Sequence, residues 1–164
     1  MDDPASPITA VPVGVFRPER FEAVLPKDSF ETFMGAVTQA ANVFAGRVVW
    51  NVNSTARGGG VAEMLRSLVA YARGAGVDAR WAVISGTPPF FEVTKRLHNH
   101  LHGFAGDRGP LGDRETEVYR EAAALNAGAL ATVVHPDDVV ILHDPQTAGL
   151  CAAMKETGAT VLWR

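Results

Sequence analysis

The spacing of apolar and polar residues switches repeatedly between a helical period and a strand period along the chain. Apolar residues at helical spacing predict helices over about 29–43, 61–73, 90–101, 113–131 and 146–156. Short apolar runs, most of them rich in β-branched residues, predict buried strands over about 47–52, 77–84, 139–142 and 160–163. Strands that alternate with helices predict an α/β fold, a Rossmann-like parallel sheet with helices on both faces.

The first 26 residues differ from the rest because they carry five prolines. We predict an extended arm there, with at most an edge strand at Val13–Phe16. Asp28 and Glu31 form a capping-box pattern at the start of the first helix. We therefore divide the chain into an arm and helix over residues 1–45 and a Rossmann-like domain over residues 46–164.

Composition narrows the class of protein. The 164 residues are 47% hydrophobic and 20% charged, which is typical of a soluble globular domain. The net charge of −3 comes without a basic block, so we expect no nucleic-acid partner. No apolar run approaches the roughly 20 residues of a bilayer helix, so we expect no membrane partner. The N-terminus lacks the pattern of a signal peptide, and a single cysteine, Cys151, excludes an internal disulfide. We expect a cytoplasmic protein.

A glycine-rich segment follows the first predicted strand and opens the next helix. Gly58, Gly59 and Gly60 leave the backbone bare, and a helix N-terminus offers free N–H groups to phosphate or sugar oxygens. No Gly-Lys-Ser/Thr follows, so this is no P-loop. Glu63 stands where a dinucleotide-binding loop has its third glycine, and its carboxylate suits a sugar hydroxyl better than a pyrophosphate. The alternative is a plain flexible turn.

A second polar group, His143-Asp144-Pro145-Gln146, follows the third predicted strand of the domain. The carboxyl ends of parallel strands face the ligand crevice of such a sheet. His143 and Asp144 can bond sugar hydroxyls, and a histidine can move protons near neutral pH. Alternatively, Asp144 caps the helix that follows, and both roles can hold together.

Two further groups carry weaker indications. His98 and His102 are four residues apart, the spacing of a zinc pair, but no third ligand is evident, so we predict no metal site. The same segment is either a polar helix end at the surface or a ligand contact made by Lys95, His98 and Asn99. We expect the tryptophans of the predicted strands to lie in the core, namely Trp50, Trp81 and Trp163.

Four segments together resemble one enzyme family. VVWNVNSTARGGGVAEMLRSLV, VDARWAVISGTPPFFEVTKRLHNHLHG, VVILHDPQTAGL and the final VLWR resemble, in this order, the trehalose-forming glycosyltransferases. These trehalose synthases join a nucleotide-activated glucose to free glucose. Retaining trehalose phosphorylases are similar in the same segments. The resemblance covers roughly residues 46–164 and leaves the N-terminal arm outside it.

The resemblance implies a GT-B fold, in which two Rossmann-like domains enclose the active site. The first domain holds the acceptor sugar, and the second, absent from this chain, holds the nucleotide sugar. The implied catalytic residues are His143 and Asp144. The implied substrate-binding residues are Gly58, Gly59, Gly60, Glu63, Lys95, His98, Asn99 and Gln146. His100 and His102 depart from the family pattern.

The resemblance also implies the function. We expect the N-terminal part of a trehalose synthase that transfers glucose from a nucleotide-glucose to glucose with retention, and that is inactive alone. The implied partners are glucose or trehalose, and the nucleotide-glucose through the second domain; no cofactor is implied. A homo-oligomer is a further expectation, because the face toward the second domain would be exposed. The alternatives are half of a trehalose phosphorylase and a non-catalytic sugar-binding or interaction module.

Overall fold

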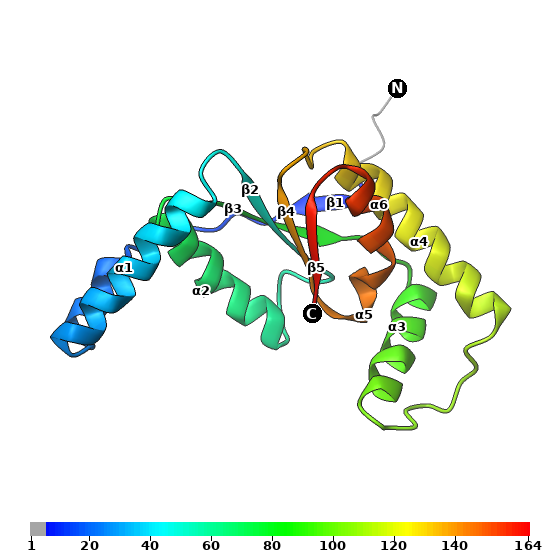
Figure 1. The fold of residues 1–164 in the computed structure, drawn as a ribbon. Coiled ribbons are helices and arrows are strands. Elements are labelled where there is room, and N and C mark those ends of the chain that lie inside the picture. The colour runs from blue at the N-terminus through cyan, green and yellow to red at the C-terminus, as the bar shows by residue number, and fades with distance from the viewer. Residues whose placement is uncertain (1–5) are drawn as a thin grey trace.

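The computed structural model describes residues 6–164 and is built around one five-stranded sheet (Figure 1). The strand order is β1-β3-β2-β4-β5, and only β1 runs antiparallel to its neighbour, β3. The strands are β1 (Ile8–Ala10), β2 (Val48–Asn53), β3 (Asp78–Ile84), β4 (Val139–Leu142) and β5 (Thr160–Trp163). The predicted α/β fold with a mostly parallel sheet is confirmed.

Helices connect the strands. They are α1 (Lys27–Val43), α2 (Gly60–Gly74), α3 (Pro88–Leu101), α4 (Asp113–Ala131), α5 (Asp144–Thr147) and α6 (Cys151–Glu156), with 3-10 turns η1 (Pro18–Ala23) and η2 (Ala148–Leu150). In Figure 1, α1 extends away from the sheet at one end of the molecule, while α3 and α4 form the other end. Among residues 6–164, no helix combines the length and the apolar character that a bilayer crossing needs.

Two apolar cores lie on opposite faces of the sheet. Alternate residues of β2 point to opposite faces, so Val49 packs with Leu65 and Val69 of α2, while Val52 packs with Leu130 of α4. The face toward α4 also buries side chains from α3, η2 and α6, such as Phe90, Leu150 and Met154. Helices therefore cover both faces, as the pattern of the sequence predicts.

The N-terminal segment differs from its prediction in three ways. The predicted arm begins in residues 1–5, which lie outside the described part of the chain. The edge strand is Ile8–Ala10, not Val13–Phe16, which instead crosses the C-terminal part of α2, where the Phe16 N–H donates to the Ala70 carbonyl at 3.0 Å. The capping box at Asp28 and Glu31 is also wrong, because α1 begins at Lys27 with Pro26 as its N-cap and no side-chain capping bond.

The predicted helix over 146–156 is divided into α5, η2 and α6. The cause is Tyr119 of α4, whose hydroxyl donates to the Pro145 carbonyl at 2.7 Å and accepts from the Gly149 N–H at 2.8 Å. These two backbone groups would bond each other in a continuous α-helix. The inserted hydroxyl therefore breaks the helix just after α5.

The exposure of each tryptophan depends on the position of its strand in the sheet. Trp50 and Trp81 lie in central strands and are buried, as predicted. Trp163 is 48% exposed, so its prediction as a core residue is wrong. The reason is that β5 forms one edge of the sheet.

Candidate functional site

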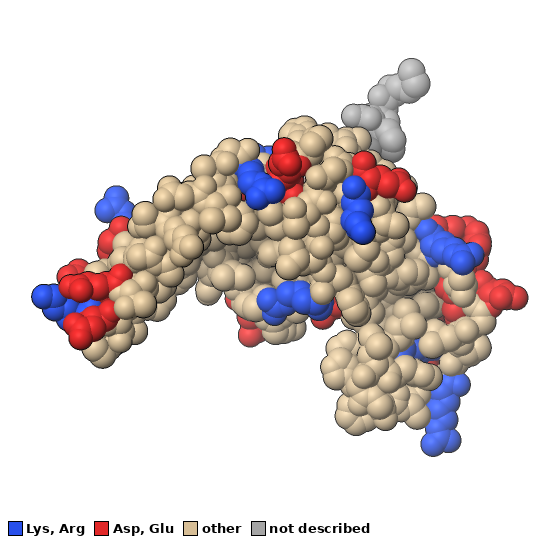
Figure 2. All heavy atoms as spheres, in the orientation of Figure 1, with Lys and Arg blue, Asp and Glu red and all other residues tan. Residues whose placement is uncertain are grey.

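A cleft of about 450 Å³ opens at the carboxyl ends of β2 and β4. Its walls come from the glycine-rich loop, α2, α3, the start of α5 and the end of β5. The lining residues are Asn53, Ser54, Thr55, Gly58, Gly59, Gly60, Val61, Ala62, Met64, His98, Asp144 and Arg164. This is the crevice where open α/β sheets bind their ligands. The space-filling view is hollowed between the lobe that carries α3 and the part built by α2, and its charged side chains form no large patch of one sign (Figure 2).

The glycine-rich loop is anchored at its start and open at its tip. The buried Asn53 accepts from the Trp81 indole N–H at 2.8 Å and donates to the Thr55 carbonyl at 2.8 Å. Gly58 and Gly59 have φ of 74° and 82°, a region that favours glycine. A Cβ atom built on Gly58, Gly59 or Gly60 would meet no other atom within 4 Å. The bare backbone of this loop therefore faces open space, where a ligand can approach closely.

Helix α2 begins at this loop. Its N-cap, Gly59, contributes no side-chain capping bond, and the Glu63 N–H makes a helix-type bond to the Gly59 carbonyl at 3.3 Å. The first N–H groups of a helix point outward from its end and carry a partial positive charge. The end of α2 can thus favour phosphate or sugar oxygens in the cleft.

Asp144 faces this loop across the cleft. Its backbone has φ of 67°, which is uncommon for a residue other than glycine. Bonds to the end of β5 hold it, because the Asp144 N–H donates to the Arg164 carbonyl at 2.8 Å and the Trp163 indole donates to the Asp144 carbonyl at 2.9 Å. His143 is the N-cap of α5, and no side chain caps that helix, so the predicted capping role of Asp144 is wrong.

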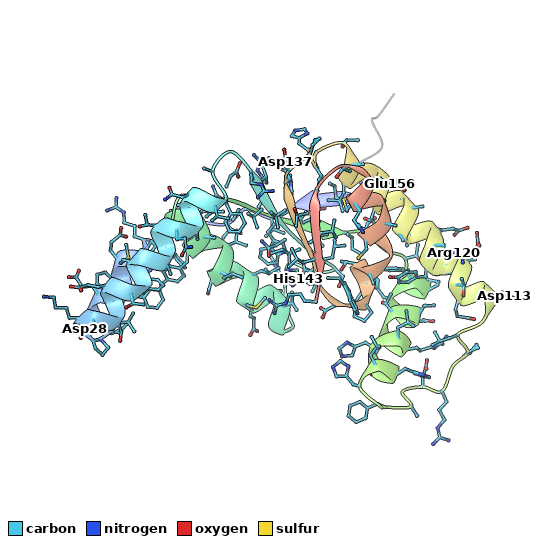
Figure 3. All side chains as sticks on the ribbon, in the orientation of Figure 1. Asp28, Asp113, Arg120, Asp137, His143 and Glu156 are labelled. Atoms are coloured by element: carbon cyan, nitrogen blue, oxygen red, sulfur yellow. The ribbon has the colours of Figure 1, made fainter. Side chains whose placement is uncertain are left out.

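His143 lies behind the cleft wall. Figure 3 labels it between α2 and α5, and its side chain is only 1% exposed. Its Nε2 atom is 3.2 Å from the Oδ1 atom of Asn51 on β2, whereas its Nδ1 atom has no hydrogen-bond partner within residues 6–164. Burial lowers the pKa of His143 below its ordinary 6.5, the positive charge of Arg164 lowers it further, and Asp144 opposes the shift. The ring therefore favours its neutral form.

Helix α3 brings His98 to the cleft. The rings of His98 and His102 stack with centroids 4.3 Å apart, and His102 Nδ1 is 2.9 Å from the His98 carbonyl. No set of three or more His, Cys, Asp or Glu side chains in residues 6–164 is arranged to hold a metal ion. Lys95 is exposed and is not among the residues that line the cleft. Asn99 packs its side chain near Gly106, and its carbonyl accepts from the Phe104 N–H at 2.8 Å.

The structure thus brings together part of the predicted set. Gly58, Gly59, Gly60, His98 and Asp144 share one cleft. Glu63 lies beside an adjoining depression, which Arg57 and Arg66 also line and which shares Gly58 with the cleft. His143 and Gln146 lie within two residues of Asp144 in the chain without lining the cleft, and the buried Oε1 atom of Gln146 has no bonding partner within the described residues.

Sequence reasoning missed several residues of the cleft. Asn53 and Arg164 are the clearest, since Asn53 anchors the loop and Arg164 is the one Lys or Arg among the described residues that line the cleft. A signal for Asn53 was present, because asparagine is depleted in strands and here ends a buried one. Arg164 directly follows a strand that ends at the same edge of the sheet, which was also a usable signal.

Comparison with known proteins gives one consistent answer. The profile of the family described as "Trehalose synthase, N-terminal domain" matches residues 51–164. The trehalose synthase of Rubrobacter xylanophilus is 43% identical over 114 residues, which cover 70% of this chain and 27% of that protein. The trehalose synthase of Pyrococcus horikoshii is 38% identical over 134 residues, covering 82% of this chain and 31% of that protein.

More distant matches agree. A trehalose phosphorylase of Pleurotus pulmonarius is 34% identical over 110 residues, covering 63% of this chain and 15% of that protein. The crystal structure of an α,α-trehalose 6-phosphate synthase from Burkholderia multivorans superposes with a TM-score of 0.51 at 17% identity, over 71% of this chain and 32% of that one. At that identity the likeness shows the fold, which is of the GT-B type. The chain spans less than a third of the length of the trehalose synthases described above.

Proposed function

Because this chain belongs to the family of trehalose synthase N-terminal domains, we propose that it forms the acceptor side of a retaining glucosyltransferase. The reaction joins glucose from a nucleotide-glucose to free glucose and yields trehalose. One observation carries the proposal: the open glycine-rich loop faces Asp144 and His98 across a single cleft at the carboxyl edge of the sheet.

Each wall of the cleft suits one part of this reaction. The Asp144 carboxylate can accept hydrogen bonds from the hydroxyls of an acceptor sugar. The bare loop lets the transferring sugar come close, and the first N–H groups of α2 suit the oxygens of a leaving diphosphate. The cleft has room for a sugar ring, and Arg164 adds a positive charge on its wall.

We propose front-face transfer without a protein nucleophile. The acceptor hydroxyl oxygen forms a bond to the anomeric carbon on the face from which the diphosphate leaves. The bond from this carbon to the diphosphate oxygen breaks, and the hydroxyl proton passes to the departing diphosphate. The protein contributes by holding both sugars in line and stabilising the charge that develops on the leaving group.

A second domain is part of this proposal. The trehalose synthases that match are more than three times as long as the matched segment. We propose that a second Rossmann-like domain binds the nucleotide, and that this chain holds the acceptor.

Phosphorolysis of trehalose is the second candidate. The 34% identity to a trehalose phosphorylase over 110 residues favours it, because that match covers 63% of this chain. In this case inorganic phosphate would attack trehalose at the place that the diphosphate occupies in synthesis.

A fused enzyme tests the proposal. This chain would replace the matching segment of the Rubrobacter xylanophilus trehalose synthase. The fusion would be assayed for trehalose from glucose with several nucleotide-glucoses, and separately with glucose 1-phosphate. We expect product with a nucleotide-glucose. Product from glucose 1-phosphate alone would establish phosphorolysis instead, and no product from a folded fusion would contradict both.

A matched pair of variants locates the site within the fusion. Asp144→Asn removes the carboxylate charge in the cleft, and we expect kcat/KM to fall by about tenfold or more, since hydrogen bonds to charged groups are worth about 1.5–3 kcal/mol. Asp78→Asn changes an exposed carboxylate at the opposite end of β3, where it pairs with Arg80 at 2.7 Å. Equal losses of kcat/KM in both variants would contradict the placement of the active site in this cleft.

A further inference from the structure

Asn51 and His143 form a buried pair near the carboxyl ends of β2 and β4. Asn51 is 4% exposed and His143 is 1% exposed. The Asn51 Oδ1 and His143 Nε2 atoms lie 3.2 Å apart, although Asn51 lies on β2, His143 directly follows β4, and the two residues are 92 positions apart in the chain. A buried amide in the middle of a central strand is unusual, so its partner is informative.

The pair determines where the ring proton of His143 resides. The Oδ1 atom of Asn51 can only accept, so the hydrogen bond requires a proton on Nε2. A neutral imidazole then carries no proton on Nδ1, which becomes an acceptor. Burial and the charge of Arg164, which lower the pKa of His143, agree with a neutral ring. A proton on Nδ1 would instead leave a buried donor without a partner.

The Nδ1 atom is one of two buried side-chain acceptors that have no partner within residues 6–164, and the other is Oε1 of Gln146. They lie three residues apart in the chain, on either side of the cleft residue Asp144. Unpaired buried polar atoms are rare in native proteins and call for a physical explanation. Two bare acceptors within two residues of a cleft residue fit a donor-rich ligand, and a sugar carries several O–H donors.

We propose that Asn51 is a positioning residue that holds His143 as the tautomer protonated on Nε2, so that Nδ1 stands as an acceptor for a hydroxyl hydrogen. That this hydroxyl belongs to a sugar rests on the proposed function, whereas the role of Asn51 in setting the tautomer does not. A water molecule offers the same O–H chemistry, and the experiment separates the two sources.

Nitrogen-15 NMR of the histidine rings in this 164-residue chain tests the role of Asn51. The chain has five histidines, and His143→Gln identifies the signals of His143 by their loss. We expect a protonated Nε2 and an unprotonated Nδ1 in the wild-type chain at pH 7.5. A ring protonated on Nδ1, or an even mixture of the two forms, would overturn the proposal.

Three variants sharpen this test. Asn51→Leu should abolish the single tautomer. Asn53→Leu is the matched control. Asn53 lies on the same face of β2 and is also buried, but it bonds Trp81 rather than His143. This variant should leave the tautomer of His143 unchanged. Asn51→Asp keeps an acceptor in place, so it should preserve the tautomer and raise the pKa of His143 by about one unit or more. An unchanged His143 pKa in a folded Asn51→Asp chain would overturn the contact itself.

The fused enzyme tests the sugar. With Asn51→Leu we expect kcat to fall by about tenfold or more while KM for glucose changes much less, because the misplaced proton affects the transition state more than binding. Rescue by Asn51→Asp would support this assignment. An unchanged kcat beside a lost tautomer would show that Nδ1 serves a water molecule rather than the reacting sugar. A fusion without any activity contradicts the proposed function, and the NMR result on the isolated chain still decides the role of Asn51.

Discussion

The three glycines of the loop serve different purposes. Gly58 and Gly59 adopt φ of 74° and 82°, so any side chain there strains the backbone as well as entering the cleft. Gly60 is the first residue of α2 and lacks a left-handed φ, while a Cβ atom on it would still meet open space in the cleft. Gly60 is therefore the position where approach of the ligand can be tested apart from folding.

Gly60→Ala should separate binding from stability. Alanine is favoured over glycine in a helix by about 0.5–1 kcal/mol, so urea unfolding of the chain should show unchanged or slightly higher stability. The added methyl occupies the ligand's side of the loop, and kcat/KM of the fused enzyme should fall by about tenfold or more. Gly35→Ala, inside α1 and also free of neighbours, is the control that should change stability alone. Full activity in Gly60→Ala would argue against close approach.

His143 should make stability depend on pH. Its pKa in the folded chain is lowered from the ordinary 6.5, so the unfolded chain binds a proton more readily. Stability should then fall as pH drops below about 6.5, by at most about 1.4 kcal/mol per pH unit, until the folded-state pKa is reached. Urea midpoints measured from pH 7.5 to 5 would report this. The pH dependence of stability should weaken in His143→Gln and persist in His100→Gln, because His100 is exposed. Identical profiles for the wild type and both variants would contradict this prediction.

At the level of elements, the position of α5 depends on a side chain far away in the sequence. The Tyr119 hydroxyl bridges the Pro145 carbonyl and the Gly149 N–H. It thereby ends α5 at Thr147, three residues after the cleft residue Asp144. The backbone of Asp144 is also held from the other side by Arg164 and Trp163.

Tyr119→Phe should therefore affect the cleft although Tyr119 is not among its lining residues. Two hydrogen bonds are lost, and we expect a cost of about 1–3 kcal/mol in the free energy of unfolding. With the hydroxyl gone, the Gly149 N–H can bond the Pro145 carbonyl directly, so α5 and Asp144 should shift and kcat/KM of the fusion should fall. Tyr71→Phe is the control, because that ring stacks against Phe16 and Phe21 near the arm, away from α5. A melting-temperature loss without any kinetic change would confine Tyr119 to a structural role.

These contacts explain what could be predicted from sequence. The strands at 139–142 and 160–163 and the helix at 113–131 are confirmed, because their patterns are long or strongly apolar. The break after α5 was beyond prediction, since the hydroxyl that causes it lies 30 residues from Gly149. The edge strand at Ile8–Ala10 has three residues, too few for a periodic pattern.

The same reasoning applies to the candidate site. The glycine loop and Asp144 were predictable because each directly follows a strand at the carboxyl edge of the sheet. Glu63 lies on a helix, where the direction of each side chain depends on how the helix is rotated on the sheet. The neighbours Ala62 and Leu65 take the buried face of α2, which turns Glu63 outward. Burial of His143 depends on strand order, which the sequence pattern leaves open.

On the scale of the whole molecule, the exposed apolar surface is uneven. Leu162 and Trp163 on the edge strand β5 are 50% and 48% exposed, and α1 has no buried residue and packs chiefly on η1. Exposed apolar surface of this kind favours association. The sheet edge at β5 is also adjacent to the cleft through Arg164. Figure 1 shows α1 extending away from the sheet at one end of the molecule, whereas β5 lies near its middle.

We predict that this chain alone makes no detectable trehalose from glucose and any nucleotide-glucose. Among its lining residues the cleft offers one arginine and one helix N-terminus to a diphosphate. A helix terminus favours an anion by about 0.3–1 kcal/mol, whereas enzymes lower barriers by roughly 8 kcal/mol or more. Transfer also needs a closed, water-poor cleft that holds both sugars. The measurement is chromatography of products after long incubation of the pure chain, with the fused enzyme as positive control under the same conditions. Turnover near the ordinary enzyme range of roughly 1 per second or faster would mean that one domain supplies the whole active site.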